Sequence, residues 1–425
     1  MSAVYFSKLD SRDTEPALFI NRTPDVEWLK RNLEGYLGVT DARLGRAFRV
    51  TGAKGSGKTI FVRNVLKQLK GQHGGRTLFI EVDCRRCPGS REVFGAVAAC
   101  AVSELIRLKG ASASIKQELI DAANLLNTIT RFTDAELREV HEHLTQYKAA
   151  SGLSAKVALL SSLQANFGIS LERSDKQIKQ LTGSIRFDEY RLCAALRAFF
   201  DDVRDQGLNV VLFIDNIDEL HHDYREAAQR EKVRQQAEWV LELKQAKVAL
   251  VACMRTYYAD IARDIGNKLM LDPLPPNMLQ GILERRVKDE PAPIREEYER
   301  ADVKRLANRL AFAAPTPLAY IEWFKVLCEQ DAFESSSQDK AIRRFVTAEY
   351  AGVPFDVLKS VVRAFPAPGE EIDVKALLDA CGGRESELAA VQDRQVVLPN
   401  DFWNPTRFSL DPSLHILHPD ALKRN

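Results

Sequence analysis

Short continuous apolar runs recur along much of the chain and alternate with longer stretches in which apolar residues return every three or four positions. The runs lie at 47–50, 77–83, 210–214, 248–252 and 269–274. A continuous apolar run is typical of a strand buried on both faces, and the wider spacing is typical of a helix. The alternation predicts an α/β fold with a parallel sheet.

The helical patterns surround these runs on both sides. They lie at about 25–37, 58–69, 91–108, 115–129, 134–148 and 187–203. Between 110 and 185 the pattern contains only helices and a short extended piece beginning at Phe167, which is long for a connection between neighbouring strands. We interpret 110–185 as a helical insertion in the α/β core, which either contacts a protein partner or only packs on the core.

The pattern changes after Pro273–Pro276, where the prolines end the last strand. Helices are predicted at 277–287 and 301–312. From about Phe345 three short helices precede two extended segments, 396–400 and 407–410. Helices followed by a hairpin of this size suggest a winged helix, a domain that binds DNA or docks protein. Its basic residues are few for a DNA surface, so both roles stay open.

Composition narrows the classes further. The 425 residues carry a formal charge of +1, so a nucleic-acid contact has to come from a local basic patch. Seven cysteines, an odd number, favour free thiols over a disulfide framework, and we expect Cys84 and Cys87 to lie in a surface loop. The chain has no apolar run near the ~20 residues of a membrane span and no signal-peptide pattern, so we expect a cytoplasmic protein without membrane contact.

A phosphate-binding loop is predicted at Gly52–Thr59, whose sequence is Gly-Ala-Lys-Gly-Ser-Gly-Lys-Thr. It lies between a predicted strand and a predicted helix, the context that this motif requires. Glycines let backbone N–H groups approach a triphosphate, the Lys58 ammonium reaches its β- and γ-phosphates, and the Thr59 hydroxyl ligates Mg²⁺. We expect nucleotide contacts from Gly52, Gly55, Ser56, Gly57, Lys58, Thr59 and Ile60.

A second nucleotide signal ends the run 210–214. Asp215 follows it directly, and ligands lie at the carboxyl ends of strands in parallel sheets. We therefore expect Asp215 to hold Mg²⁺ together with Thr59.

The order of phosphate loop, insertion and apolar strand ending in Asp215-Asn-Ile-Asp218-Glu219 resembles the STAND and origin-recognition branch of AAA+ P-loop ATPases. In standard AAA+ members a glutamate after the strand aspartate polarises the attacking water, and Asn216 stands at that position here. An amide cannot accept the proton, so either Asp218 or Glu219 serves as the base or hydrolysis is slow. We favour slow turnover with Asp218 assisting.

The resemblance implies roles for four further residues. Arg22 lies in a turn that closes over adenine in these families, although Asn21 replaces their glycine and a plain capping turn is the alternative. Arg255 occupies the sensor position after run 248–252, and Arg263 occupies the region of an arginine finger, where a solvated helix charge is equally common. Pro317 resembles the lid proline that packs on nucleotide, or it simply starts a helix.

The resemblance also implies the organisation and function of the whole chain. The parts are an arm and first helix over 1–46, a P-loop core over 47–272, a helical lid over 273–345 and a winged-helix-like domain over 346–425. The missing sensor 2 arginine favours a STAND-type switch that binds and slowly hydrolyses ATP, forms homo-oligomers, and signals from a DNA or protein partner in bacterial defence. The alternative is a DNA-binding loader or remodelling motor of the origin-recognition type.

Overall fold

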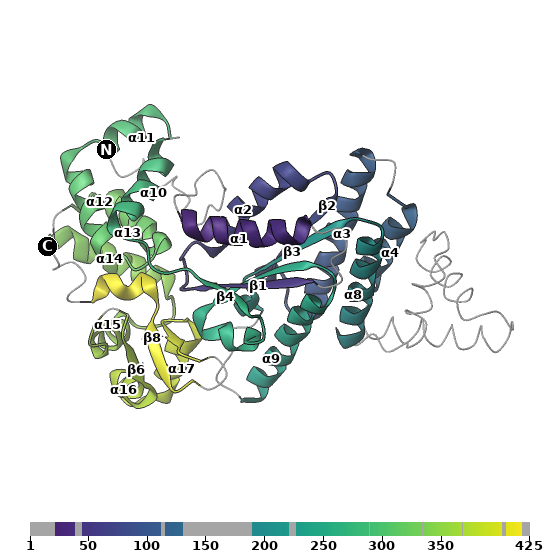
Figure 1. Cartoon of the computed structure of the whole chain (residues 1–425). Helices are drawn as coiled ribbons and strands as arrows, with labels where there is room; N and C mark the ends of the chain where they lie inside the picture. The colour runs from purple at the N-terminus through teal and green to yellow at the C-terminus, as the bar shows by residue number, and fades with distance from the viewer. Residues whose placement is uncertain are drawn as a thin grey trace.

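The computed structural model describes residues 22–38, 45–111, 115–130, 189–220, 227–288, 290–333, 335–367, 369–401 and 405–418. An α/β unit is followed by a group of helices and then by a small C-terminal unit of helices and short strands (Figure 1). The helix predicted at 134–148 and the extended piece at Phe167 lie outside the described residues.

A parallel sheet forms the centre of the α/β unit and confirms the predicted fold class. Its order is β2-β3-β4-β1-β5. The strands are β1 (Arg46–Gly52), β2 (Thr77–Asp83), β3 (Asn209–Asp215), β4 (Ala249–Arg255) and β5 (Asn267–Met270). The last strand was expected at 269–274 and lies slightly earlier. The Leu271 N–H still bonds the Thr51 carbonyl at 2.8 Å, but Pro273 has no N–H with which to continue the ladder.

Helices cover both faces of the sheet. On one face, α1 (Thr23–Leu37) and α2 (Lys58–His73) pack against β1 and against alternate residues of β3 such as Val211 and Phe213. The intervening Val210, Leu212 and Ile214 face the opposite side. This alternation explains why the strand is apolar at every position.

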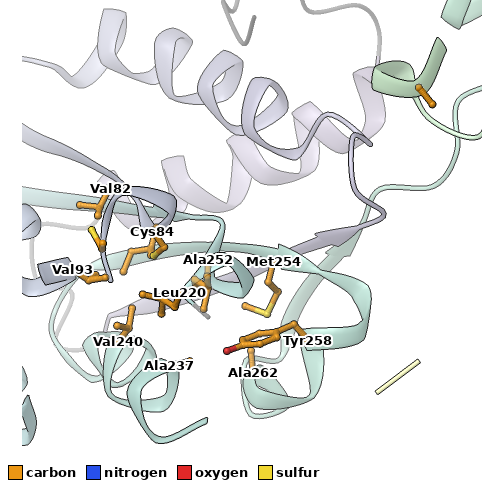
Figure 2. Close-up of a cluster of buried hydrophobic side chains, with 14 of the residues drawn as sticks. Val82, Cys84, Val93, Leu220, Ala237, Val240, Ala252, Met254, Tyr258 and Ala262 are labelled. Carbon is orange, nitrogen blue, oxygen red and sulfur yellow. The ribbon is translucent and has the colours of Figure 1, made fainter. Parts of the chain in front are cut away.

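The opposite face is covered by α3 (Ser90–Ala111), α4 (Gln117–Ile129), α8 (Glu189–Asp205) and α9 (Ala227–Leu241). Figure 2 shows part of its core, where Tyr258 of the 3₁₀ segment Thr256–Ala262 lies beside Met254 of β4, and Val240 of α9 belongs to the same cluster. Helix α4 lies inside the range predicted as an insertion, yet it packs on α3 and α8 and completes this layer. The start of that range therefore belongs to the core.

The two cysteines of the Cys84-x-x-Cys87 pair are free, as predicted, but they are not in a surface loop. Their exposed fractions are 0% and 6%, because both side chains join the core beneath β2. In the described part of the chain, no cluster of three or more His, Cys, Asp or Glu side chains is arranged to hold a metal ion. Nor does any helix there combine the length and apolar character needed to cross a membrane.

In the described residues five helices follow the sheet, and two of them confirm the helices predicted at 277–287 and 301–312. The five are α10 (Pro276–Lys288), α11 (Ala292–Tyr298), α12 (Ala301–Ala313), α13 (Pro317–Glu329) and α14 (Ser335–Glu349). Trp323 of α13 is fully buried, and its indole N–H donates to the Ser413 carbonyl at 3.0 Å. This contact joins the helical unit to the C-terminal unit.

The C-terminal unit contains the three predicted helices and the predicted hairpin. The elements are α15 (Phe355–Ala364), β6 (Glu371–Asp373), α16 (Val374–Ala380), α17 (Glu385–Asp393), β7 (Val397–Pro399), β8 (Arg407–Leu410) and the 3₁₀ segment η8 (Pro412–Leu417). The strands form an antiparallel sheet in the order β6-β8-β7. Strand β6 was not predicted, since three residues are too few to show an alternating pattern.

Candidate nucleotide-binding site

A cavity of about 410 Å³ lies at the carboxyl ends of the central strands. Its wall combines residues of the loop after β1, the ends of β2, β3 and β4, the start of α13, and the C-terminal unit. Ten of the predicted site residues line it: Arg22, Gly55, Ser56, Gly57, Lys58, Thr59, Ile60, Asn216, Arg255 and Pro317. The cavity therefore collects groups that the sequence placed far apart.

The loop Gly52–Thr59 has the backbone geometry of an anion cradle. Gly55 and Gly57 have φ of 76° and 90°, values that side chains rarely adopt, and Gly57 caps the N-terminus of α2. The N–H groups of a first helical turn have no partner within the helix, and together with the helix dipole they favour a negative ligand.

Lys58 projects along this loop and is only 8% exposed. Its Nζ donates to the carbonyls of Gly52 and Ala53, each at 3.0 Å. Burial lowers the pKa of Lys58 below its ordinary value, while Asp218 opposes that shift. An ammonium held by carbonyls beside an anion cradle is placed to bind phosphate.

Thr59 and Asp215 meet beneath the loop. The Thr59 hydroxyl donates to Asp215 Oδ2 at 2.6 Å, and Asp215 is 1% exposed. Burial raises the pKa of Asp215 to about 6, although the Thr59 hydrogen bond lowers it. A buried carboxylate with so little compensating charge, beside a hydroxyl oxygen, matches the oxygen donors that Mg²⁺ uses. These two residues fit the metal that the sequence predicted.

Asn216 connects the ends of two neighbouring strands. It has a φ of 56°, a left-handed conformation that asparagine tolerates, and its Nδ2 donates to Asp83 Oδ1 at 2.9 Å. Asp83 also holds Arg85, which donates from Nε to both carboxylate oxygens at 3.0 Å and from Nη2 at 2.6 Å. Sequence reasoning missed Asp83 and Arg85, although their place at and just after the carboxyl end of a parallel strand was a signal.

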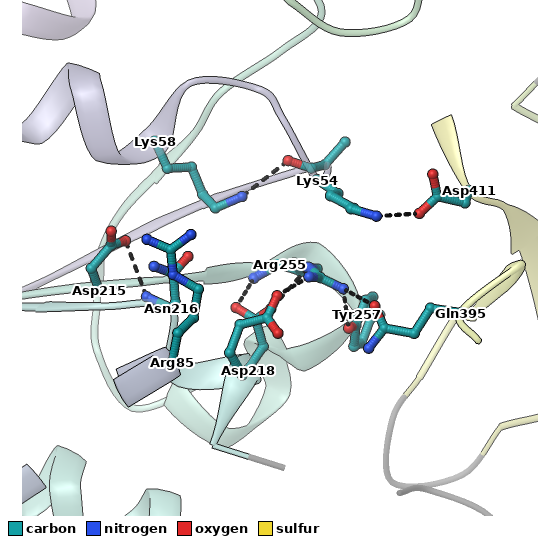
Figure 3. A network of polar contacts seen from close by, with 12 residues as sticks. Lys54, Lys58, Arg85, Asp215, Asn216, Asp218, Arg255, Tyr257, Gln395 and Asp411 are labelled. Carbon is teal, nitrogen blue, oxygen red and sulfur yellow. Dashed lines mark hydrogen bonds and ion pairs between the residues drawn. The ribbon is translucent and has the colours of Figure 1, made fainter. Parts of the chain in front are cut away.

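Arg255 is the centre of a second polar network (Figure 3). Its Nε lies 3.0 Å from Asp218 Oδ2, and its backbone N–H donates to Asp218 Oδ1 at 2.9 Å. A second guanidinium nitrogen pairs with Glu219, and a third donates to Tyr257 and Gln395 at 3.1 and 3.2 Å. The sequence predicted Asp218 beside the attacking water, whereas both of its oxygens bind Arg255 in the structure.

The helix after the cavity contacts the phosphate loop directly. Thr316 caps α13 by accepting the Ala319 N–H, and Pro317 takes the first helical position. A Cβ on Gly55 would lie 2.5 Å from Leu318 Cβ, so the loop and α13 touch. Pro317 thus starts a helix and also lines the cavity, and its packing on a nucleotide stays a prediction.

Two other predicted residues take different places. Arg22 lines the cavity and donates to the Asp272 carbonyl, next to the end of the sheet. Arg263 has a side chain that is 75% exposed and pairs with Asp260 three residues earlier, and it does not line the cavity.

The C-terminal unit reaches the loop through a buried charge. Asp411 is fully buried, and its Oδ2 lies 3.0 Å from Lys54 Nζ (Figure 3). Gln395 and Ser413 add two more of its residues to the cavity wall. A contact between positions 357 residues apart left no trace in the local sequence pattern, so sequence reasoning could not find it.

Comparison with known proteins agrees with this geometry. Residues 27–238 match the AAA ATPase domain family, a range that runs from α1 to α9 and includes the phosphate loop and Asp215. The chain contains an AAA ATPase domain.

Solved structures resemble the chain over nearly its whole length at low identity. The Aeropyrum pernix ORC1 protein in complex with DNA is 15% identical, with 97% of each chain covered and a TM-score of 0.45. The A. pernix ORC2 protein in ADPNP–ADP complexes is 13% identical, with 96% of this chain and 98% of that chain covered and a TM-score of 0.42. Drosophila ORC bound to DNA is 13% identical, with 97% and 92% covered and a TM-score of 0.37. No curated protein sequence matches the chain.

Proposed function

We propose that this protein is a molecular switch that binds ATP with Mg²⁺ and hydrolyses it slowly. The observation that carries the proposal is the composition of the cavity wall, to which the AAA ATPase domain, α13 and the C-terminal unit all contribute. A ligand held there contacts three parts of the chain at once, so its phosphates can bias how those parts sit on one another.

Lys58 and the N–H groups of the first turn of α2 would hold the phosphates, and Thr59 and Asp215 would hold Mg²⁺. When bound, Mg²⁺ bridges the β- and γ-phosphate oxygens and offsets their charge. Arg22 and Pro317 lie in the wall of the same cavity, where the base of the nucleotide would fit.

Slow hydrolysis follows from the lack of an unpaired carboxylate among the candidate bases near Asp215 that are named here. Position 216 carries an amide, and the two next candidates, Asp218 and Glu219, both pair with Arg255. A carboxylate paired with an arginine is a weak base, because the cation stabilises its charged form. We now assign Asp218 to holding Arg255 in place, and Glu219, which lines the cavity, is the stronger candidate for the base.

We further propose that the C-terminal unit is a winged helix and that it transmits the nucleotide state to a partner. Its three helices and antiparallel hairpin support the first part. Its contacts with Lys54 and Arg255 support the second, because both residues belong to the nucleotide site. In this scheme ATP changes the position of the unit, and with it self-assembly or partner binding.

The decisive experiment compares wild type, Lys58→Ala and the control Lys67→Ala, which removes an exposed lysine from the same helix. Loss of a charged hydrogen bond of about 2–3 kcal/mol should weaken ATP binding by about 30- to 150-fold in Lys58→Ala only. Calorimetric titration with ATP and Mg²⁺ measures this change. Equal affinity in all three proteins would refute nucleotide binding at this site.

Light scattering with ADP, with ATP and with a non-hydrolysable ATP analogue, each with and without duplex DNA, tests the switch. Nucleotide-dependent mass with slow turnover supports it. Fast, DNA-stimulated hydrolysis with unchanged mass would refute it in favour of a DNA loader or remodelling motor.

A further inference from the structure

We propose that Arg85 is a catalytic residue of this ATPase and that its guanidinium contacts the γ-phosphate within the same chain. The proposal rests on the proposed ATP hydrolysis and adds a residue that the phosphate loop and Asp215 do not supply. It comes from the 3₁₀ turn Cys84–Arg86, which follows β2, the strand next to the one that carries Asp215.

The sheet register brings Arg85 to the reacting end of the cavity. Strands β2 and β3 are parallel, with Asp83 opposite Asp215, so the turn after β2 lies beside the Mg²⁺ residues. Arg85 lines the cavity, and in Figure 3 its guanidinium lies close to Asp215 and Asn216. The pKa of Arg85 is raised, chiefly by its hydrogen bonds to Asp83, and the charges of Asp215 and Glu219 raise it further.

The side chain is held in place before any ligand arrives. Asp83 binds Nε and Nη2 of Arg85, and Asn216 fixes the orientation of Asp83 from the other side. This arrangement leaves the edge of the Arg85 guanidinium that carries Nη1 for a second anion. The side chain remains 53% exposed, which leaves room for that anion.

Arg255 is the competing guanidinium in the cavity wall, and its own contacts argue against the same role. It is 7% exposed as a side chain and binds two carboxylates, a tyrosine hydroxyl and an amide. Its charge and its donors are therefore already matched. Among the described residues, Arg85 has one carboxylate partner, Asp83, and keeps capacity for phosphate.

The chemical step places charge where Arg85 can bind it. A water oxygen forms a bond to the γ-phosphorus, and the bond between that phosphorus and the bridging oxygen breaks. The bridging electron pair stays on ADP, and the water gives one proton to the medium as inorganic phosphate forms. A fixed guanidinium beside the γ-phosphate oxygens stabilises the charge that they carry in the transition state.

The test measures single-turnover hydrolysis of ATP and calorimetric affinity for ATP and ADP. The variants are Arg85→Ala, Arg85→Lys and the control Arg86→Ala, which removes the neighbouring exposed arginine that does not line the cavity. Arg85→Ala should lower the rate about 100- to 1,000-fold, with ADP affinity within about threefold of wild type. Arg85→Lys should retain part of the rate, and guanidinium ion should rescue Arg85→Ala but not Lys58→Ala.

Each outcome decides between this inference and the function on which it rests. If wild type does not hydrolyse ATP, the proposed function fails and the inference fails with it. If wild type hydrolyses ATP and Arg85→Ala matches Arg86→Ala, only the inference is refuted. Weaker ADP binding together with an unchanged rate for bound ATP would also refute it, since that pattern marks a binding role.

Discussion

Replacing Asn216 by aspartate tests how the ends of β2 and β3 are held together. The change keeps the size of the side chain and its tolerance of a φ of 56°. It exchanges the amide that donates to Asp83 for a carboxylate about 2.9 Å from that acceptor. We expect Asn216→Asp to be destabilising, and by an amount that grows with pH.

The magnitude follows from the geometry. Two unit charges 2.9 Å apart repel by about 6 kcal/mol at an effective dielectric constant of about 20. Protonating one ordinary carboxyl group at pH 7 costs less, about 4 kcal/mol, so the pair will share a proton instead. The shared proton then restores the hydrogen bond to Asp83.

The sign of the pH dependence is fixed by this shared proton. The pKa of one carboxyl is raised in the folded state, so the folded protein binds a proton that the unfolded chain has lost. Stability relative to wild type therefore falls as pH rises above the ordinary carboxyl pKa, by about 1.4 kcal/mol per pH unit. Between pH 5.5 and pH 7 the deficit should grow by about 2 kcal/mol.

Urea unfolding of wild type, Asn216→Asp and Asn216→Gly at both pH values measures this growth, without Mg²⁺ and nucleotide. Glycine accepts the same φ and loses the hydrogen bond without adding charge, so its deficit of about 1.5–3 kcal/mol should not change with pH. Asp215, with a pKa near 6, is present in all three proteins, so the comparison between variants is the observable. A deficit for Asn216→Asp that is equal at both pH values would refute the reasoning.

Two further predictions concern contacts of the phosphate loop. Burial alone would raise the pKa of Asp411, but Lys54 and the Ser413 N–H lower it below its ordinary value. Asp411→Asn should therefore lower the free energy of unfolding in urea by about 1–3 kcal/mol at pH 7. This loss should shrink as pH falls below 4, because the carboxyl group of the wild type then becomes protonated. A cost that persists unchanged at pH 3 would exclude the ion pair as its source. Gly55→Ala combines a φ of 76° with a Cβ 2.5 Å from Leu318 Cβ, so it should weaken ATP binding at least about tenfold by calorimetry. The control Gly71→Ala, where nothing outside the neighbouring residues and the backbone of its own helix lies within 4 Å of the added Cβ, should bind ATP as wild type does. Equal affinity for both variants would contradict the packing argument.

The sheet and the phosphate loop were predictable because their determinants are local. A strand buried on both faces is apolar at every position, as in 210–214, and a loop that wraps phosphate needs glycine at fixed spacing. The helices before and after the insertion were predictable for the same reason. Strand β6 was not, because its three residues are defined by pairing with β8 rather than by a pattern of their own.

The polar partnerships could not be predicted, because they depend on which strand ends lie side by side. Asp218 was assigned from its distance in sequence from Asp215, but the neighbouring β4 places the Arg255 backbone and side chain on both of its oxygens. Asp83 was recognisable only as a polar residue at the end of a strand, and its bond with Asn216 follows from the pairing of β2 with β3.

The size of the contacts between the C-terminal unit and the nucleotide site suits a switch. Two of these contacts among the described residues are Lys54 with Asp411 and Arg255 with Gln395, and hydrogen bonds to charged groups contribute about 1.5–3 kcal/mol each. Together they amount to about 3–6 kcal/mol. Shifting a two-state equilibrium from 1:99 to 99:1 requires a ligand to bind one state more tightly than the other by about 5.5 kcal/mol. The total binding free energy of a micromolar ligand is larger, about 8 kcal/mol. A nucleotide that competes for Lys54 therefore has enough binding free energy to displace a contact of this size, whereas much larger contacts would keep the unit fixed in every nucleotide state.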